Sequence, residues 1–412
     1  MISADQALDA ILEAAAPLEP RELELIEALG RTLAEDVAAD VDLPAAANSA
    51  VDGYAVIAAD SAGAAERPVR LRLLERVAAG SVPTQTVVRG TASKVLTGAV
   101  IPPGADAMVM VEHSEESEGA VSIRREARPG DFIRAAGEEL RAGEIALRRG
   151  RVLRPTELGL LASVGRSRVR AIPPPRVAIL VTGDELIEPD QPLAPGKVRN
   201  SNLPTLVALV AEAGAMPLAL EVGRDRRDQL AALIARGLEQ ADVLLTTGGV
   251  SMGDFDLIQH LLPEAGVDTR FHGVNIKPGK PLFFGARGRQ LAFGLPGNPV
   301  SAVVCFEVFV RPALRRLMGI EPALRPTTSA RLETAIKKAD GKRHFLRVTL
   351  RCDGGELLAR PTGPQGSHLI SSVARADGLL IFPEAARELG AGERAEVLPL
   401  PHAPMSMPDN AG

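Results

Sequence analysis

The chain is organised around residues 244–256, which read LLTTGGVSMGDFD. An apolar run typical of a strand leads there into glycines, hydroxyl residues and acids. Two later stretches have a similar texture: residues 276–281 read IKPGKP, and residues 294–299 read GLPGNP. Glycines let a backbone approach a ligand closely, and successive N–H groups or a helix N-terminus present partial positive charge to an anion. One such loop alone would be interpreted as an ordinary turn, but three in one α/β unit predict an anion site.

Side chains in these loops supply both signs of charge. Lys277 and Lys280 add full positive charges, while Ser251 and Ser301 add neutral donors. The acids within residues 254–256 would repel a phosphate unless a divalent cation lay between them. Carboxylate together with phosphate oxygens is how proteins commonly hold magnesium, so the pattern favours an anion bound with Mg2+.

The surrounding residues 173–320 alternate between strand and helix patterns. Residues 177–181 and 243–247 are apolar runs, and residues 226–239 carry a helical pattern between them. This alternation predicts a doubly wound, mostly parallel sheet covered on both faces, with ligands bound at the carboxyl ends of its strands. A core helix is expected over residues 299–318. The loops expected to share one cleft are residues 182–185, 223–225, 248–251 and 297–299.

The rest of the chain predicts three further domains, which makes the fold class multidomain α/β. Residues 1–43 and 135–172 share a scaffold texture and are predicted to form one split domain, with helices near residues 22–29 and 155–164. Residues 44–134 contain short alternating strands and predict an inserted β-rich domain. Residues 321–402 predict a C-terminal β-barrel-like domain, and residues 403–412 a disordered tail.

Composition excludes several classes of protein. A chain of 412 residues is long enough for about three domains. Its 46% hydrophobic and 24% charged residues are typical of globular proteins. The absence of Trp, the single Tyr and the net charge of −5 argue against a nucleic-acid binder.

Targeting signals and reactive side chains are also scarce. The N-terminus lacks an apolar signal core, and no apolar run approaches the ~18 residues of a membrane span. We therefore expect a cytoplasmic protein without a membrane partner. Cys305 and Cys352 lie far apart, and the six histidines show neither zinc spacing nor a nucleophile motif.

Seven motifs occur in order between about residue 3 and residue 400. They are VDGYA at 51–55, TG at 97–98, TGDEL at 182–186, GGVSMG at 248–253, KPGKP at 277–281, LPGNPVS at 295–301 and QGSH at 365–368. Together they resemble the molybdopterin molybdenumtransferase family, called MoeA in bacteria and the E domain in gephyrin-like proteins. The resemblance implies insertion of molybdate into the dithiolene of adenylylated molybdopterin, with release of AMP and dependence on Mg2+.

The same resemblance implies roles for individual residues. The implied catalytic residues are Asp52, Thr97, Glu185, Asp225 and Asp256, and the implied metal ligands are Glu185, Asp225 and Asp256. The implied substrate and molybdate ligands are Gly248, Gly249, Ser251, Lys277, Lys280, Pro281, Pro296, Ser301, Arg347 and Ser367. The strand pattern by itself would make Arg347 a surface residue.

Family members are elongated homodimers, so the resemblance also implies partners. The cleft lies between the α/β domain of one subunit and the inserted domain of the other, which would supply Asp52 and Thr97. The resemblance also implies contacts with the molybdopterin adenylyltransferase and with maturation factors of molybdoenzymes. We do not expect a nucleic-acid partner.

Two positions depart from some relatives. Gly273 stands where some relatives have a lysine, four residues before Lys277, so the anion site carries less positive charge. Glu139 stands where some relatives have an aspartate, so its carboxylate extends farther from the backbone. Two alternative functions stay open: a molybdopterin adenylyltransferase, which shares the α/β unit and would consume ATP, and a non-catalytic scaffold of the same fold. The cleft acids Asp52, Glu185, Asp225 and Asp256 argue against the scaffold.

Overall fold

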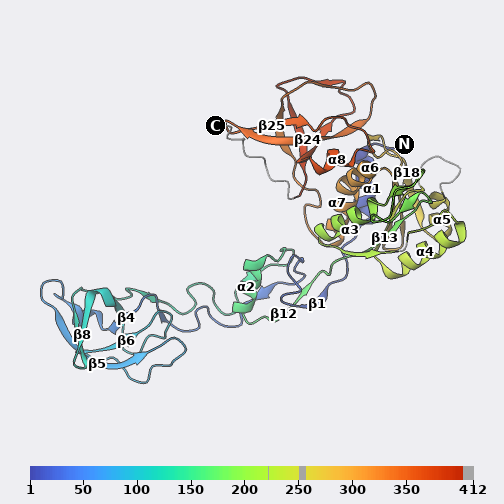
Figure 1. Ribbon diagram of the computed structural model, residues 1–412. Coiled ribbons are helices and arrows are strands. Elements are labelled where there is room, and N and C mark those ends of the chain that lie inside the picture. The colour runs from blue at the N-terminus through green and yellow to red at the C-terminus, as the bar shows by residue number, and fades with distance from the viewer. Residues whose placement is uncertain (221, 250–256, 402–412) are drawn as a thin grey trace. The chain divides into compact units, whose positions relative to one another are not determined.

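A computed structural model describes residues 1–220, 222–249 and 257–401 of the chain (Figure 1). It divides into two compact units that we describe separately. Unit 1 contains Met1–Arg21, Gly30–Thr32 and the chain from Ile172 onward, and unit 2 contains Glu22–Leu29 and Leu33–Ala171. No helix in the described parts of the chain is long and apolar enough to cross a bilayer.

The centre of unit 1 is a six-stranded sheet with the order β16-β13-β17-β21-β20-β18. The first four strands pair in parallel, whereas β20 and β18 are antiparallel to their neighbours. The predicted doubly wound, mostly parallel sheet is therefore confirmed. The strands are β13 (Arg176–Val181), β16 (Met216–Ala219), β17 (Val243–Thr247), β18 (Asp268–His272), β20 (Phe283–Arg287) and β21 (Gln290–Leu295).

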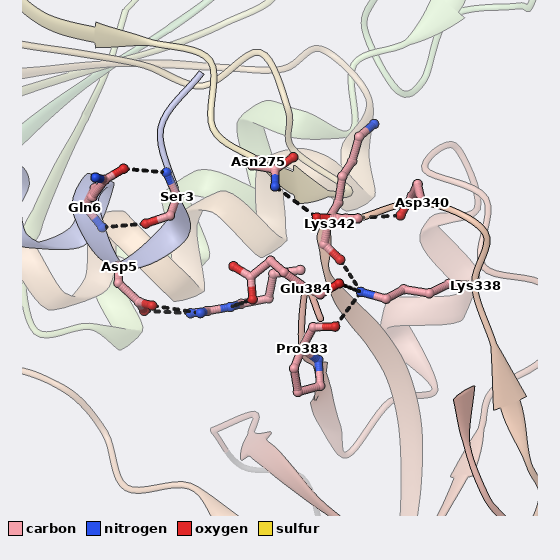
Figure 2. Close-up of polar contacts among 11 residues, drawn as sticks. Ser3, Asp5, Gln6, Asn275, Lys338, Asp340, Lys342, Pro383 and Glu384 are labelled. Carbon is pink, nitrogen blue, oxygen red and sulfur yellow. Dashed lines mark hydrogen bonds and ion pairs between the residues drawn. The ribbon is translucent and has the colours of Figure 1, made fainter. Parts of the chain in front are cut away.

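Helices cover both faces of this sheet. Alternate side chains of β13 point to opposite faces, so Ile179 packs with the cluster that includes α3 and α6, and Leu180 with the cluster of α4 and α5 (Figure 1). The helices are α1 (Ala4–Ala14), α3 (Asn202–Glu212), α4 (Arg227–Gln240), α5 (Ile258–Glu264) and α6 (Pro299–Cys305). Helix α1 begins with a capping box in which Ser3 and Gln6 exchange two hydrogen bonds (Figure 2).

The helix expected over residues 299–318 is interrupted by a π turn. Helix α6 continues into the π turn Phe306–Val310 and then into α7 (Arg311–Leu317). Glu307 in this turn is fully buried and bonds Arg311 at 2.7 and 3.0 Å and also Arg325. Arg311 in turn donates to Glu212 at 2.7 Å. These four residues form an ionic cluster in which Glu307 and Arg311 are buried and Glu212 and Arg325 are partly exposed.

The C-terminal part of unit 1 is a closed barrel, as the sequence predicted. Its strand order is β24-β25-β22-β28-β26, and an additional β24–β26 pairing closes the ring. Strand β19 (Ile276–Lys277), which precedes the barrel in sequence, adds to its edge in parallel and sets Lys277 opposite His344. The barrel strands are β22 (Thr328–Leu332), β24 (Arg343–Asp353), β25 (Glu356–Pro361), β26 (Gly378–Phe382) and β28 (Arg394–Pro399).

Unit 2 contains a six-stranded sheet of its own, ordered β7-β4-β6-β5-β9-β8. Its strands are β4 (Gly53–Val56), β5 (Val69–Val77), β6 (Thr91–Val95), β7 (Ala107–Met110), β8 (Ser114–Ser117) and β9 (Ala120–Ile123). Next to it, β3 (Asn48–Ser49) pairs with β10 (Ile133–Arg134).

The remainder of unit 2 corrects one expectation. The helix predicted at residues 22–29 is instead the strand β1 (Arg21–Glu24), followed by a turn. Strand β1 pairs with β12 (Arg168–Ala171), and Leu23 and Leu25 pack on the cluster around Leu33. Pairing with a distant strand outweighs the local helical pattern here. The helix α2 (Pro155–Ser163) agrees with its predicted range.

Candidate active site

Three parallel strands of unit 1 end in register and bring three predicted loops together. Val181 of β13 lies beside Thr247 of β17, which lies beside Leu295 of β21. The residues that follow begin the loops named from sequence. Parallel pairing therefore places these loops at one edge of the sheet.

Gly248 is required by the close packing of these loops. Its φ is +93°, and a Cβ atom there would lie 2.5 Å from the Thr182 carbonyl oxygen. Asn202, at the start of α3, donates from Nδ2 to Thr247 Oγ1 at 3.0 Å and to the Gly297 carbonyl at 2.9 Å. One side chain thus connects the ends of two strands and fixes the shape of the edge.

A cavity of about 580 Å³, which we call the glycine-loop pocket, lies at this edge. Its walls come from the ends of β13, β17 and β21 and from the start of α3. Five predicted site residues line it: Glu185, Gly248, Gly249, Pro281 and Pro296. Ser251 and Asp256 lie outside the described residues.

Acidic side chains gather beside the glycine-loop pocket. Thr182 pairs with Gly223, which brings residues 182–185 next to residues 223–225. The Asp184 N–H donates to Asp225 Oδ2 at 3.3 Å, and the Asp225 N–H donates to Asp184 Oδ1 at 3.4 Å. Asp225 is thus hydrogen-bonded directly to the residue that precedes Glu185.

The donor set agrees with a magnesium ion. Mg2+ takes oxygen ligands, keeps several waters, and is commonly held by one or two carboxylates together with substrate phosphates. Glu185 and Asp225 supply carboxylates of this kind. Within residues 1–220, 222–249 and 257–401, no three His, Cys, Asp or Glu side chains group closely enough to hold a metal by themselves.

A second cavity of about 1160 Å³ lies between the loop of residues 276–281 and the barrel. We call it the lysine pocket. Pro281, Asn298 and His368 line both cavities, so the two are contiguous. Six predicted site residues line the lysine pocket: Lys277, Lys280, Pro281, Ser301, Arg347 and Ser367.

Arg347 is the unusual residue of the lysine pocket. It is fully buried, and it donates to Ser372 Oγ at 3.2 Å and to the carbonyls of Phe345 and Gly366 at 3.4 and 3.3 Å. Among the described residues, no carboxylate lies within 4.0 Å of its guanidinium. Burial lowers the pKa of Arg347 to about 10, so it stays charged at neutral pH. The exposed arginine expected from the strand pattern is instead a buried cation without a counter-ion in the described chain.

Sequence reasoning missed one wall of this pocket. Lys337, Lys338, Asp340, Lys342 and His344 of the barrel also line it. Their signal was the basic run IKKADGKRH at residues 336–344 in a chain of net negative charge. The run faces the anion site because β19 pairs with β24, a contact between segments far apart in sequence.

The polar contacts of this wall hold one histidine beside Lys277. His344 Nε2 lies 2.6 Å from Asp340 Oδ1. The Lys342 N–H donates to the same oxygen at 3.3 Å (Figure 2). Lys338 Nζ donates to neutral carbonyls, including Pro383 at 2.5 Å (Figure 2). It also lies 4.7 Å from the ring centroid of Phe382. Burial lowers the pKa of His344, although its hydrogen bond to Asp340 opposes that shift.

Asp52 and Thr97 meet in unit 2. Asp52 Oδ1 accepts from the Thr97 backbone N–H at 2.7 Å and from Thr97 Oγ1 at 2.8 Å. The backbone bond and then the side-chain bond lower the pKa of the Asp52 carboxyl. Gly53 follows directly, and a Cβ there would lie 2.2 Å from the Val109 carbonyl oxygen. Only glycine therefore fits at position 53. This close packing of the strand fixes the position of the neighbouring Asp52 carboxylate.

Family models match three consecutive parts of the chain. Residues 2–165 match the MoeA N-terminal region (domain I and II), residues 178–316 a probable molybdopterin binding domain, and residues 329–400 the MoeA C-terminal region (domain IV). The three matches together span most of the described chain.

Curated proteins and solved structures agree with these matches. The chain is 38% identical to molybdopterin molybdenumtransferase 2 of Mycobacterium tuberculosis, over 92% of this chain and 94% of that protein. It is 36% identical to the molybdopterin molybdenumtransferase of Bacillus subtilis, over 91% and 88%. The crystal structure of the molybdopterin biosynthesis MoeA protein from Pyrococcus horikoshii covers 97% of this chain with a TM-score of 0.79 at 30% identity, and is itself covered completely (100%).

Proposed function

The chain belongs to the MoeA family of molybdopterin molybdenumtransferases, which are transferases of molybdenum cofactor biosynthesis, and from this premise we propose its reaction. It inserts molybdate into the dithiolene of adenylylated molybdopterin and releases AMP. The observation that carries the proposal is Arg347, a buried cation without a carboxylate partner in the described chain, in a pocket contiguous with the glycine loops.

The lysine pocket suits a small tetrahedral dianion. Lys277, Lys280 and Arg347 line it, and Lys337, Lys338 and Lys342 add charge from the barrel. At an effective dielectric constant of ~20, each unit-charge contact at ~4 Å contributes roughly 4 kcal/mol before desolvation. A local cluster of this kind can bind an oxyanion although the whole chain carries a net charge of −5.

The glycine-loop pocket suits the phosphates of the adenylylated pterin. Backbone N–H groups near Gly248 and Gly249, together with the N-terminus of a neighbouring helix, can hold phosphate oxygens. Glu185 and Asp225, with Asp256, would hold Mg2+, which when bound would neutralise charge on the leaving phosphate. Water then cleaves the phosphoanhydride after molybdate is seated on Lys277 and Arg347.

The assembly follows the family resemblance, and the location is the one expected from the sequence. We propose a cytoplasmic homodimer in which the second subunit supplies Asp52 and Thr97. We also propose that the domains have the boundaries predicted from the sequence. We also propose delivery of substrate by a molybdopterin adenylyltransferase and transfer of product to maturation factors. Neither nucleic acid nor membrane is part of this scheme.

The decisive test is AMP release from adenylylated molybdopterin by the purified protein. We expect release that needs Mg2+, increases with molybdate and stops when EDTA is added. Release that is indifferent to molybdate would contradict the transferase reaction. AMP attachment to molybdopterin with consumption of ATP would favour the adenylyltransferase, and substrate binding without any release would favour the scaffold.

We predict that molybdate binds more tightly as pH falls from about 7.5 to about 6, and that His344 causes this change. Burial lowers the pKa of His344, so its imidazole is neutral at neutral pH. An oxyanion beside Lys277 favours the imidazolium, so binding takes up a proton. Affinity then rises on acidification, by at most about tenfold per pH unit for one proton. Calorimetric titration of molybdate at several pH values measures the effect.

The charged groups that act on His344 are Asp340 on its own segment, Lys277 on β19, and Lys338 beside the Phe382 ring. His344→Asn removes the titration and should flatten the pH profile. His260→Asn, an exposed site on α5, is the matched control and should keep the slope. Equal slopes in both variants would show that His344 is not the titrating group.

A further inference from the structure

Phe132 in unit 2 has a backbone conformation that bulky residues rarely adopt. Its φ is +56°, in the left-handed region where a Cβ atom is crowded. Among the described residues, Glu118 is the other non-glycine residue with positive φ, and it precedes Gly119 in the tight turn between β8 and β9. Such hairpin turns require positive φ, so Glu118 has an ordinary explanation. Phe132 joins no such pair of strands.

The Phe132 ring gains little burial in return for this strain. The residue is 37% exposed, and it lies outside the apolar clusters formed by the described residues. Neighbouring backbone holds it in place: its carbonyl accepts from Ala50 at 2.9 Å, and the next N–H, of Ile133, donates to Gly130 at 3.2 Å. Strain that the surroundings enforce without packing to offset it is a feature of functional sites.

Backbone hydrogen bonds link Phe132 and the Thr97 turn to the loop that carries Asp52. The loop of residues 49–52 bonds to Phe132 through Ala50 and to residues 98–99 through Ser49, at 2.8 and 3.0 Å. Leu96, next to Thr97, is also exposed. Two exposed apolar side chains therefore lie on segments that are bonded or adjacent to the Asp52 loop. The Asp52 carboxylate accepts from Thr97 through Oδ1, and its Oδ2 has no hydrogen bond to the described chain.

We propose that Phe132 is a substrate-contacting residue that packs on the pterin ring of adenylylated molybdopterin, while Asp52 accepts hydrogen bonds from the pterin. The inference rests on the proposed function, which puts Asp52 in the active site. A carboxylate only accepts hydrogen bonds, and the pterin edge with its amino group and ring N–H offers two adjacent donors. The amino edge of adenine pairs a donor with an acceptor and fits a carboxylate less well. Aromatic faces add stacking to this polar recognition.

Binding and stability of two variants test the proposal. Phe132→Asn removes the ring, and asparagine tolerates positive φ, so the variant should unfold at the same or a higher temperature than the unaltered protein. Its affinity for adenylylated molybdopterin, followed by pterin fluorescence, should fall about three- to tenfold. Phe132→Tyr keeps the ring and should bind as the unaltered protein does. Affinity for AMP alone should stay the same in both.

Val82→Asn is the matched control, because Val82 is an exposed apolar residue elsewhere in unit 2, and it should change neither affinity nor stability. Unchanged pterin affinity in Phe132→Asn would overturn the proposal. A lower unfolding temperature would also overturn it, because the ring would then stabilise the fold. Weaker self-association with intact binding would overturn it as well, because the ring would then lie between copies of the chain. Because binding is measured directly, a failure of AMP release in the unaltered protein would count against the proposed function alone.

Discussion

Replacing Arg347 by methionine is expected to lower kcat/KM for molybdate by about 100-fold, the usual effect of removing one oriented donor from a charge-stabilising site. The guanidinium is fully buried, lines the lysine pocket, and bonds to neutral oxygens of Ser372, Phe345 and Gly366 within the described chain. A dianion bound there would be its counter-ion. Steady-state AMP release over a range of molybdate concentrations measures the loss.

Protein stability should move in the opposite direction. A buried cation without a counter-ion destabilises the fold, and burial already lowers the pKa of Arg347 to about 10. Methionine keeps most of the volume without the charge, so the free variant should unfold at the same or a higher temperature. Molybdate should raise the unfolding temperature of the unaltered protein but not that of the variant.

The matched control lies on the same strand. Arg351 is exposed and bonds Glu333 at 2.7 Å and Asp353 at 2.9 Å, so Arg351→Met should leave activity nearly unchanged. Arg347→Lys should recover part of the activity, because a lysine retains the charge without the planar donor fork. An Arg347→Met variant that is less stable and saturates normally with molybdate would establish a structural role instead.

Replacing Glu307 by alanine is expected to destabilise unit 1 by about 3–5 kcal/mol, as removal of one partner from a buried ion pair generally does. Glu307 is fully buried and bonds both Arg311 and Arg325. Without it, Glu212 remains as the carboxylate bonded to Arg311 at 2.7 Å. The excess buried positive charge is the physical reason for the loss. Urea unfolding of unit 1, followed by circular dichroism, measures it.

Two further variants define the origin of that loss. Glu264→Ala removes an exposed carboxylate that bonds exposed Arg227, and it should cost no more than about 0.5 kcal/mol. Glu307→Gln keeps the shape of the side chain and some of its hydrogen bonds. Its loss in free energy of unfolding should therefore lie between those of Glu264→Ala and Glu307→Ala. A loss below about 1 kcal/mol for Glu307→Ala would mean that the cluster relaxes or admits water.

Several elements followed from local sequence. Ser3 and Gln6 are three residues apart, so their capping box depended only on one helix turn. The apolar runs of β13 and β17 predicted parallel strands, and parallel strands by geometry bring the following loops to one edge. The position of the glycine loop at residues 248–249 in a cleft therefore follows from strand order and spacing alone.

Other features depended on contacts between distant residues. Residues 22–29 carry a helical pattern, but pairing with β12, more than 140 residues away in sequence, turns residues 21–24 into a strand. The strand pattern around Arg347 predicted exposure, but the side chain is buried and bonds the Gly366 carbonyl and Ser372 Oγ, which lie outside the barrel strands. Backbone strain at Phe132 had no sequence signal, because the surrounding hydrogen bonds create it.

The α/β class, the glycine loops at the strand ends and the motifs of the molybdopterin molybdenumtransferase family could all be predicted from the amino-acid sequence. These follow from periodicity and from short spacings, which act within one element or between consecutive elements. The burial of Arg347, the pairing of His344 with Lys277, and the position of the basic run 336–344 in the anion pocket required the three-dimensional structure. Those outcomes depend on which distant strands pair, and pairing is selected by burial of the whole core and not by any local pattern.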